Sequence, residues 1–314
     1  MIVAITGGTG FIGKHLIAKH VARGDQVRYL TRGKAAEDIR GASAHIGSLG
    51  SSVDELRQFV RRADVLYHCA AELRNEAEMH NTTVQGTANL LAAAAGEIGR
   101  WVQLSSTGVY GSRRYGDIRE DAAIAPANAY EISKAKSDEL VCAAAEIQRL
   151  PCVVLRPSNV YGTDMPNRSL FQLIGMIDRG MFFFIGKRGA VANYIHVENV
   201  VDALLLCATA DLPGYGRSYI VSDHRTLEDF VGIIASALEK DAPQKRLPEP
   251  LVRAAVALAG SIPGFPLKSS RVDALTNRTV YRTDRIASEL GYRNRISMEE
   301  GIGELARYWK IGST

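Results

Sequence analysis

The amino-acid sequence predicts an α/β fold, in which a doubly wound parallel sheet carries a smaller, mainly helical C-terminal part. Strand patterns alternate with helical patterns through the first half of the chain, as in parallel sheets covered by helices on both faces. A glycine-rich turn separates the first strand from the first helix. Prolines punctuate the helical C-terminal third at Pro243, Pro248, Pro250, Pro263 and Pro266.

Six short apolar segments of the first half are expected to form strands. They span residues 3–6, 27–31, 44–46, 65–69, 101–105 and 152–155. Helical patterns between them include residues 82–95 and 130–147. After Pro157 the alternation stops, and a helix over 197–208 and a strand over 218–221 are expected.

These patterns divide the chain into two predicted domains. Residues 1–165 form a nucleotide-binding domain of the Rossmann type, to which residues 191–225 return. Residues 166–190 and 226–314 form the substrate-binding domain. The richest apolar stretch, residues 251–262, is too short to span a membrane and is expected to form a packed helix.

The first helix is preceded by the turn Gly7-Gly8-Thr9-Gly10-Phe11-Ile12-Gly13, directly after a strand. This context makes a dinucleotide site the favoured interpretation. The glycines allow a tight turn and a close approach of the backbone to a pyrophosphate, and Gly13 allows close packing of helix on strand. The helix N-terminus offers free N–H groups and the positive end of the dipole.

The end of the second strand indicates which dinucleotide is preferred. An NAD site usually has an acidic residue there to bind the ribose hydroxyls. This chain has Thr31 and Arg32, with Lys34 close by, and Asp25 lies before the strand. A guanidinium suits a 2′-phosphate because it offers charge and paired donors. The sequence therefore predicts NADP(H) as the preferred cofactor, with NAD(H) possible.

Tyr130 and Lys134 are four residues apart in a predicted helix and therefore share one face. An ammonium beside a phenol favours the phenolate and lowers the pKa of the tyrosine from near 10. Such a tyrosine can take a proton from an alcohol or give one to a carbonyl oxygen. Beside a nicotinamide, this pair indicates hydride transfer.

Composition restricts the partners and the compartment. The net charge of +4 is spread along 314 residues, which does not favour a nucleic-acid partner. No signal peptide or membrane span is expected, and no three residues have the spacing of a metal site; His15 and His20 are assigned to a helix surface. The cysteines are interpreted as buried free thiols of a cytoplasmic protein: Cys69, Cys142, Cys152 and Cys207.

Taken in order, the motifs resemble those of the extended short-chain dehydrogenase/reductase family, also called the NAD-dependent epimerase/dehydratase family. Besides the glycine turn and the Tyr130/Lys134 pair, four segments carry this resemblance. They are Ser105-Ser106-Thr107-Gly108-Val109-Tyr110-Gly111, Leu155-Arg156-Pro157-Ser158-Asn159-Val160-Tyr161-Gly162, Ile195-His196-Val197-Glu198-Asn199-Val200 and Ala287-Ser288-Glu289-Leu290-Gly291-Tyr292. The resemblance covers nearly the whole chain and implies a homodimer.

The resemblance implies roles for individual residues. Tyr130 is the expected general acid/base, Lys134 binds the nicotinamide ribose, and Ser106 hydrogen-bonds the reacting oxygen. The expected cofactor contacts are Gly7, Thr9, Gly10, Phe11, Ile12, Gly13, Arg32, Ser48, Leu49, Ala70, Ala71, Tyr130, Lys134, Pro157 and Val160. The expected substrate contacts are Ser106, Thr107, Asn159 and Arg271.

Departures from the family pattern narrow the function. Dehydratases of the family carry Thr-Asp-Glu where this chain has Ser106-Thr107-Gly108, so dehydration is not expected. The arginine that grips a nucleotide diphosphate is Ala192 here, and Arg188 and Arg271 are candidates to replace it.

The leading hypothesis is an NAD(P)-dependent oxidoreductase or epimerase acting on a secondary alcohol or ketone of a nucleotide sugar, by C4 keto-reduction or epimerisation. One alternative is an NADPH-dependent reductase or dehydrogenase of a hydrophobic alcohol or ketone, of the hydroxysteroid or dihydroflavonol type. The loss of an arginine at Ala192 and the apolar residues 181–184 favour this alternative. The other alternative is a catalytically silent NADP-binding sensor.

Overall fold

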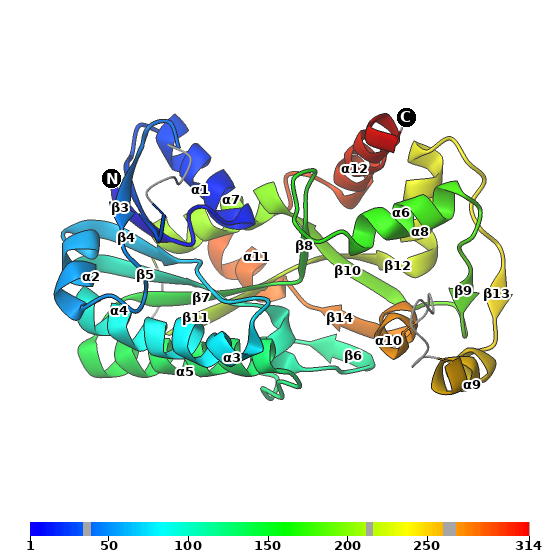
Figure 1. The fold of residues 1–314 in the computed structure, drawn as a ribbon, viewed down its shortest axis with the longest axis horizontal. Coiled ribbons are helices and arrows are strands. Elements are labelled where there is room, and N and C mark those ends of the chain that lie inside the picture. The colour runs from blue at the N-terminus through cyan, green and yellow to red at the C-terminus, as the bar shows by residue number, and fades with distance from the viewer. Residues whose placement is uncertain (34–38, 212–215, 260–267, 314) are drawn as a thin grey trace.

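The computed structural model describes residues 1–33, 39–211, 216–259 and 268–313. At its centre lies a seven-stranded parallel sheet in the order β11-β7-β5-β4-β1-β2-β3 (Figure 1). Each of the seven predicted strands is present. Their bounds are β1 Ile2–Thr6, β2 Gln26–Thr31, β3 Ala42–Ile46, β4 Ala63–His68, β5 Ile98–Leu104, β7 Cys152–Pro157 and β11 Arg217–Val221.

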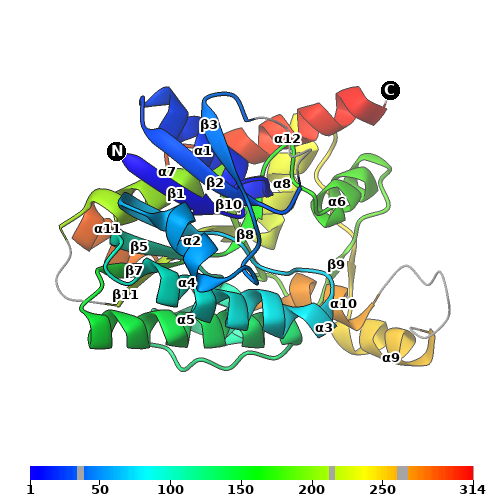
Figure 2. The same ribbon diagram turned by 60° about the vertical axis from the view of Figure 1, so that its left-hand side comes forward.

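Helices cover both faces of this sheet (Figures 1 and 2). One face carries α1 Phe11–Ala22, α7 Val197–Thr209 and α11 Asp284–Leu290, and the other carries α2 Val53–Val60, α4 Gly86–Ala94 and α5 Ala129–Gln148. Side chains of a strand alternate between the faces. Val3 and Ile5 accordingly pack with the first group of helices, while Ala4 between them packs with the second.

The predicted helix over residues 82–95 is divided in two. The chain passes from α3 Glu76–Met79 through a π-helical turn, η1 His80–Gln85, into α4. The π turn buries Thr83, whose hydroxyl accepts a hydrogen bond from the Glu72 amide at 3.2 Å. The predicted helices over 130–147 and 197–208 are present as α5 and α7.

The C-terminal part is mainly helical and has its own hydrophobic core. Its helices are α6 Ser169–Asp178, α8 Leu227–Ala237, α9 Glu249–Ala259, α10 Ser269–Thr276 and α12 Met298–Ser313. Small sheets join β8 Asn159–Tyr161, β10 Val191–His196 and β12 Asp223–Thr226, then β9 Phe184–Ile185 and β13 Arg246–Leu247, and β6 Tyr115–Ile118 and β14 Arg278–Tyr281. Phe182 and Phe184 pack edge to face inside this part, at 5.0 Å between centroids.

Helix α9 is less packed than the sequence suggested. Val252 and Val256 are buried on one side of it, but Leu251 and Leu258 are 67% and 86% exposed. Residues 260–262 of the predicted helix lie outside the described residues. No helix in the described part of the chain is both long and apolar enough to cross a membrane.

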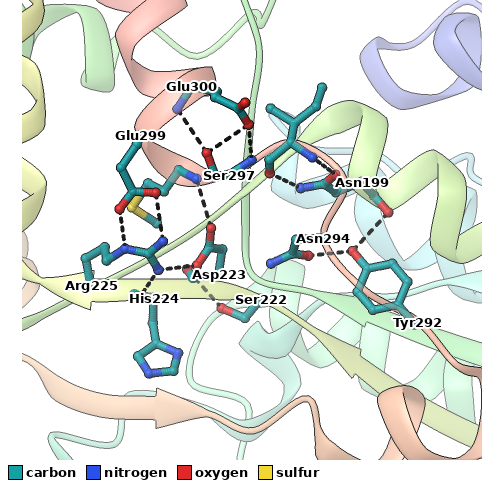
Figure 3. A network of polar contacts seen from close by, with 12 residues as sticks. Asn199, Ser222, Asp223, His224, Arg225, Tyr292, Asn294, Ser297, Glu299 and Glu300 are labelled. Atoms are coloured by element: carbon teal, nitrogen blue, oxygen red, sulfur yellow. Dashed lines mark hydrogen bonds and ion pairs between the residues drawn. The ribbon is translucent and has the colours of Figure 1, made fainter.

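A polar joint connects the large sheet to the C-terminal helix α12 (Figure 3). The buried side chain of Asn199, on α7, accepts hydrogen bonds from the amides of Arg295 and Ile296 at 3.0 and 2.9 Å and donates to the Ile296 carbonyl at 2.7 Å. Arg225, on β12, forms two parallel hydrogen bonds with the Glu299 carboxylate of α12, at 2.7 and 2.9 Å. The joint therefore fixes the start of α12 from two sides.

The exposure of some side chains differs from the sequence interpretation. His20 is not on the surface of α1 but fully buried, because its ring nitrogens contact the Asp25 carboxylate at 2.7 Å and the Tyr67 hydroxyl at 3.1 Å. The four cysteines are free, as expected, but only Cys152 and Cys207 are fully buried.

Candidate active site

A cleft opens at the carboxyl ends of β1, β2, β4, β5 and β7, where parallel α/β sheets bind their ligands. Every residue that the sequence assigns to the cofactor lines it. These residues are Gly7, Thr9, Gly10, Phe11, Ile12, Gly13, Arg32, Ser48, Leu49, Ala70, Ala71, Tyr130, Lys134, Pro157 and Val160. Segments far apart in the sequence therefore meet at one site.

The glycine turn has the shape that a pyrophosphate site needs. Gly7 has a φ of +70°, and a Cβ atom there would lie 2.7 Å from the Ala70 amide nitrogen. A Cβ on Gly13 would lie 2.1 Å from the Gly7 carbonyl oxygen. Among the described residues, no side chain caps the N-terminus of α1 at Gly10, and its first turn contains no acidic residue. The cradle and its free N–H groups fit a dinucleotide pyrophosphate.

Arg32 is exposed and lines the cleft directly after β2. Glu72, which sequence reasoning missed, lines the same cleft. Its carboxylate accepts hydrogen bonds from the amides of Leu73, Arg74 and Asn75 at 2.9–3.1 Å. These bonds, together with the nearby Arg32, lower the pKa of Glu72. Lys34, the other predicted cation, lies outside the described residues.

The three predicted catalytic residues meet where β5 ends beside α5. The Tyr130 phenol is hydrogen-bonded to the Ser106 side chain. Ser106 also accepts a hydrogen bond from the Gly108 amide at 3.1 Å, which fixes its orientation. The Lys134 ammonium is only 2% exposed and donates to the Leu104 carbonyl at 2.5 Å.

The electrostatics of Tyr130 differ from the expectation. Burial raises the pKa of the phenol to about 12, and the hydrogen bond from Ser106 only partly opposes this. The expected lowering by Lys134 is not found in the structure, where the ammonium donates to the Leu104 carbonyl instead. Burial also lowers the pKa of Lys134, against an opposing contribution from the Asp138 carboxylate.

Of the four predicted substrate residues, two line the cleft and two lie outside its lining. Ser106 and Asn159 line the cleft. Thr107 is buried and hydrogen-bonded to Tyr281, and it is not among the lining residues. Arg271 is also outside the lining and donates to the Gln172 side chain of α6 instead.

Sequence reasoning also missed a buried charged group behind the cleft. Asp138 and Arg156 form an ion pair at 3.3 Å, with both side chains more than nine-tenths buried. Asp138 lies four residues after Lys134, so helical spacing would have placed it on the same face as Tyr130 and Lys134. Among the described residues, no group of three or more histidine, cysteine, aspartate or glutamate side chains could hold a metal ion.

Comparison with known proteins identifies the family. Residues 3–221 match the model of the NAD-dependent epimerase/dehydratase family. This chain belongs to that family. It is an enzyme of the NAD(P)-dependent short-chain oxidoreductase and epimerase type.

Individual known proteins match this chain almost end to end. The chain is 30% identical to a 4-hydroxy-2-methyl-3-oxo-4-farnesyl-3,4-dihydroquinoline-1-oxide ketoreductase from Stigmatella aurantiaca, covering 98% of this chain and 96% of the relative. It is 25% identical to UDP-glucose 4-epimerase from Vibrio cholerae, covering 97% and 94%. The crystal structure of UDP-glucuronic acid 4-epimerase from Bacillus cereus in complex with NAD superimposes with a TM-score of 0.77 at 17% identity, covering all of both chains. That likeness supports the extended form of the Rossmann fold.

Proposed function

We propose that this enzyme transfers a hydride between NADP(H) and a secondary alcohol or ketone, with a nucleotide sugar as the leading substrate class and Tyr130 as the general acid/base. The convergence of Tyr130, Ser106 and Lys134 on the cleft that also holds the glycine turn carries this proposal. A phenol at this position can protonate an oxygen of a molecule bound beside the dinucleotide.

Each catalytic side chain has a defined task in the proposed reaction. When bound, a nicotinamide supplies or accepts the hydride. In reduction, Tyr130 gives its proton to the carbonyl oxygen, and in oxidation it takes the proton of the alcohol. Ser106 donates a hydrogen bond to the same oxygen and so stabilises its developing charge. Lys134 lines the same cleft, and its task in the proposed reaction is to bind the nicotinamide ribose.

The nucleotide-sugar assignment is supported by the relatives that are epimerases of such sugars, including the one from Vibrio cholerae. Elimination of water is not favoured, because Thr107 and Gly108 provide no carboxylate. The side chain of Glu131 lies beside Gly108, but its carboxylate accepts a hydrogen bond from the Ala127 amide at 2.7 Å. Keto-reduction and epimerisation are therefore preferred over dehydration.

A hydrophobic ketone is the second candidate substrate. The ketoreductase from Stigmatella aurantiaca acts on a farnesylated ring system according to its name, and it is 30% identical to this chain. Among the described residues that line the cleft, the lysines and arginines are Arg32 and Lys134, both assigned to the cofactor. Ala192 is buried in the core of the C-terminal part and offers no charge to a diphosphate.

The decisive experiment combines a substrate panel with a tyrosine variant. Consumption of NADPH is measured with UDP-4-keto sugars and with hydrophobic ring ketones, and interconversion of UDP-glucose and UDP-galactose is followed separately. We expect Tyr130→Phe to lose about 10²–10⁴-fold in turnover while it keeps its cofactor affinity. Tyr115→Phe, at a 70% exposed tyrosine outside the cleft, is the matched control.

Full turnover in Tyr130→Phe would overturn the catalytic assignment. Cofactor binding without turnover of any panel member would favour a silent NADP-binding sensor instead. The homodimer and the cytoplasmic location remain predictions.

A further inference from the structure

Three consecutive residues at the end of β5 are each held by a side chain of α5. Ser106 is bound by Tyr130, and the Leu104 carbonyl accepts a hydrogen bond from Lys134 at 2.5 Å. The residue between them, Ser105, donates from its hydroxyl to the Asp138 carboxylate at 2.7 Å. The three residues of α5 are spaced by four, so they form one row on the helix.

Asp138 is the least expected member of this row, because it is a carboxylate with only 3% of its surface exposed. Its Oδ2 atom accepts the Ser105 hydrogen bond and lies 3.3 Å from both Nε and Nη2 of Arg156. Its Oδ1 atom is buried and has no hydrogen-bond partner among the described residues. A buried charge that is only partly satisfied is costly, which suggests that it serves the site.

We propose that Asp138 is a positioning residue of the hydride-transfer site, which holds the end of β5 against α5 through Ser105 and supplies a fixed negative charge behind Tyr130 and Lys134. This inference rests on the proposed function of Tyr130. Arg156 is held in turn by a hydrogen bond to the Tyr110 hydroxyl at 2.9 Å, with its guanidinium over the Tyr110 ring. Burial raises the pKa of Asp138, whereas the Arg156 guanidinium favours the carboxylate form and holds it from the far side.

The charge of Asp138 acts on both catalytic groups in the same direction. It raises the pKa of Tyr130, by opposing the phenolate, and it raises the pKa of Lys134, by favouring the ammonium. Ionisable groups that face Asp138 come from α5, β7 and the 3-10 turn η2 Thr107–Tyr110. They are Tyr130, Lys134, Cys142, Cys152, Arg156 and Tyr110.

The charge is tested with Asp138→Asn. In ketone reduction, activity requires the Tyr130 proton and the Lys134 charge, so it falls at high pH as either group loses its proton. We expect this alkaline limb of the pH profile to move to lower pH in Asp138→Asn, by about 0.5–1 unit. Glu139→Gln is the matched control, because it removes an exposed carboxylate from the next position of α5. The assay uses the panel substrate with the highest turnover.

A second readout needs no substrate. With NADP⁺ bound and tyrosine labelled at 13Cζ, the ionised fraction of Tyr130 at a fixed alkaline pH should be larger in Asp138→Asn than in the wild type. Tyr130→Phe assigns the signal. The proposed role of the Asp138 charge would be overturned if Asp138→Asn left both the pH profile of activity and the ionised fraction of Tyr130 unchanged. An equal shift in Glu139→Gln would overturn it as well.

The positioning role is tested with Ser105→Ala, which keeps the charge and removes the hydrogen bond to Asp138. We expect kcat to fall about threefold to tenfold, because one hydrogen bond is lost. The cofactor affinity and the pH profile of activity should not change. An unchanged kcat would overturn this role, and the variant serves even if Asp138→Asn does not fold. Tyr130→Phe is measured in parallel. If Tyr130→Phe stays active, the proposed function fails. If Tyr130→Phe is inactive and the Asp138 and Ser105 variants behave as the wild type, only the inference about Asp138 fails.

Discussion

The Nδ1 atom of His68 accepts a hydrogen bond from the Thr6 hydroxyl at 2.6 Å, directly before the glycine turn. The direction follows from the neighbouring contacts. Thr87 uses its hydroxyl proton on the Thr83 carbonyl at 2.5 Å, so it must accept from Nε2 of His68 at 3.0 Å. His68 therefore carries its proton on Nε2, and Thr6 is free to accept from the amide of Ala70 at 3.3 Å. A neutral imidazole thus links the end of β1 to α4 through the side chains of Thr6 and Thr87, beside the cleft.

This arrangement predicts a pH dependence of stability. Burial lowers the pKa of His68 to about 3, whereas an unfolded histidine titrates near 6.5. Below pH 6.5 the unfolded chain takes up a proton that the folded chain refuses, so stability is full above 6.5 and is lost as the pH falls toward 3. We expect the unfolding free energy of the wild type to fall by about 1.4 kcal/mol per pH unit more than that of His68→Gln.

The measurement is urea unfolding of both proteins between pH 7 and pH 4. His224→Gln, at an exposed histidine, should keep the pH dependence of the wild type. If the unfolding free energies of the wild type and His68→Gln changed equally with pH, His68 would not be a neutral group in the folded protein.

The preference for NADPH is predicted to depend on Arg32. Hydrogen bonds to a charged group contribute about 1.5–3 kcal/mol, so Arg32→Ala should weaken NADPH binding by roughly 10–100-fold. Binding of NADH, which has no 2′-phosphate, should change little. Dissociation constants from nucleotide fluorescence check this, with Arg40→Ala as a control at an exposed arginine outside the cleft. Equal losses for the two nucleotides, or a wild type without preference, would contradict the prediction.

The polar joint around Asn199 is predicted to contribute more to the free energy of unfolding than the salt bridge between Arg225 and Glu299 beside it. Asn199→Ala leaves the amides of Arg295 and Ile296 and the Ile296 carbonyl without their partner, which should cost about 2–4 kcal/mol. Glu299→Gln removes the ion pair with Arg225 at its exposed carboxylate and leaves the Arg225–Asp223 pair in place, so it should cost under about 1 kcal/mol.

Thermal unfolding of the two variants compares them directly. Equal losses of stability would mean that α12 is held mainly by its charges. Asn199 lies on α7, a helix that packs on the large sheet. The loss of stability in Asn199→Ala should therefore appear in the whole unfolding transition and not only in α12.

Much of the site could be predicted from the sequence, because its residues lie in local patterns. Gly7 and Gly13 belong to one strand-turn-helix unit, and Tyr130 and Lys134 to one helix, so spacing alone placed them. The row on α5 extends to Asp138 by the same spacing, but nothing local shows that a carboxylate there meets Ser105 and Arg156. That meeting depends on β5, α5 and β7 lying side by side, which only the sheet order decides.

The sequence by itself determined the order of strands and helices and the position of the glycine turn, and it singled out the three residues that are predicted to be catalytic. The tertiary structure decided exposure, partners and charge. It buried His20 between Asp25 and Tyr67, kept Arg271 away from the cleft, and raised the pKa of Tyr130, which local spacing had predicted to be lowered. The physical reason is that desolvation and hydrogen bonding depend on every neighbour in space, whereas helical spacing and turn chemistry depend only on neighbours in the chain.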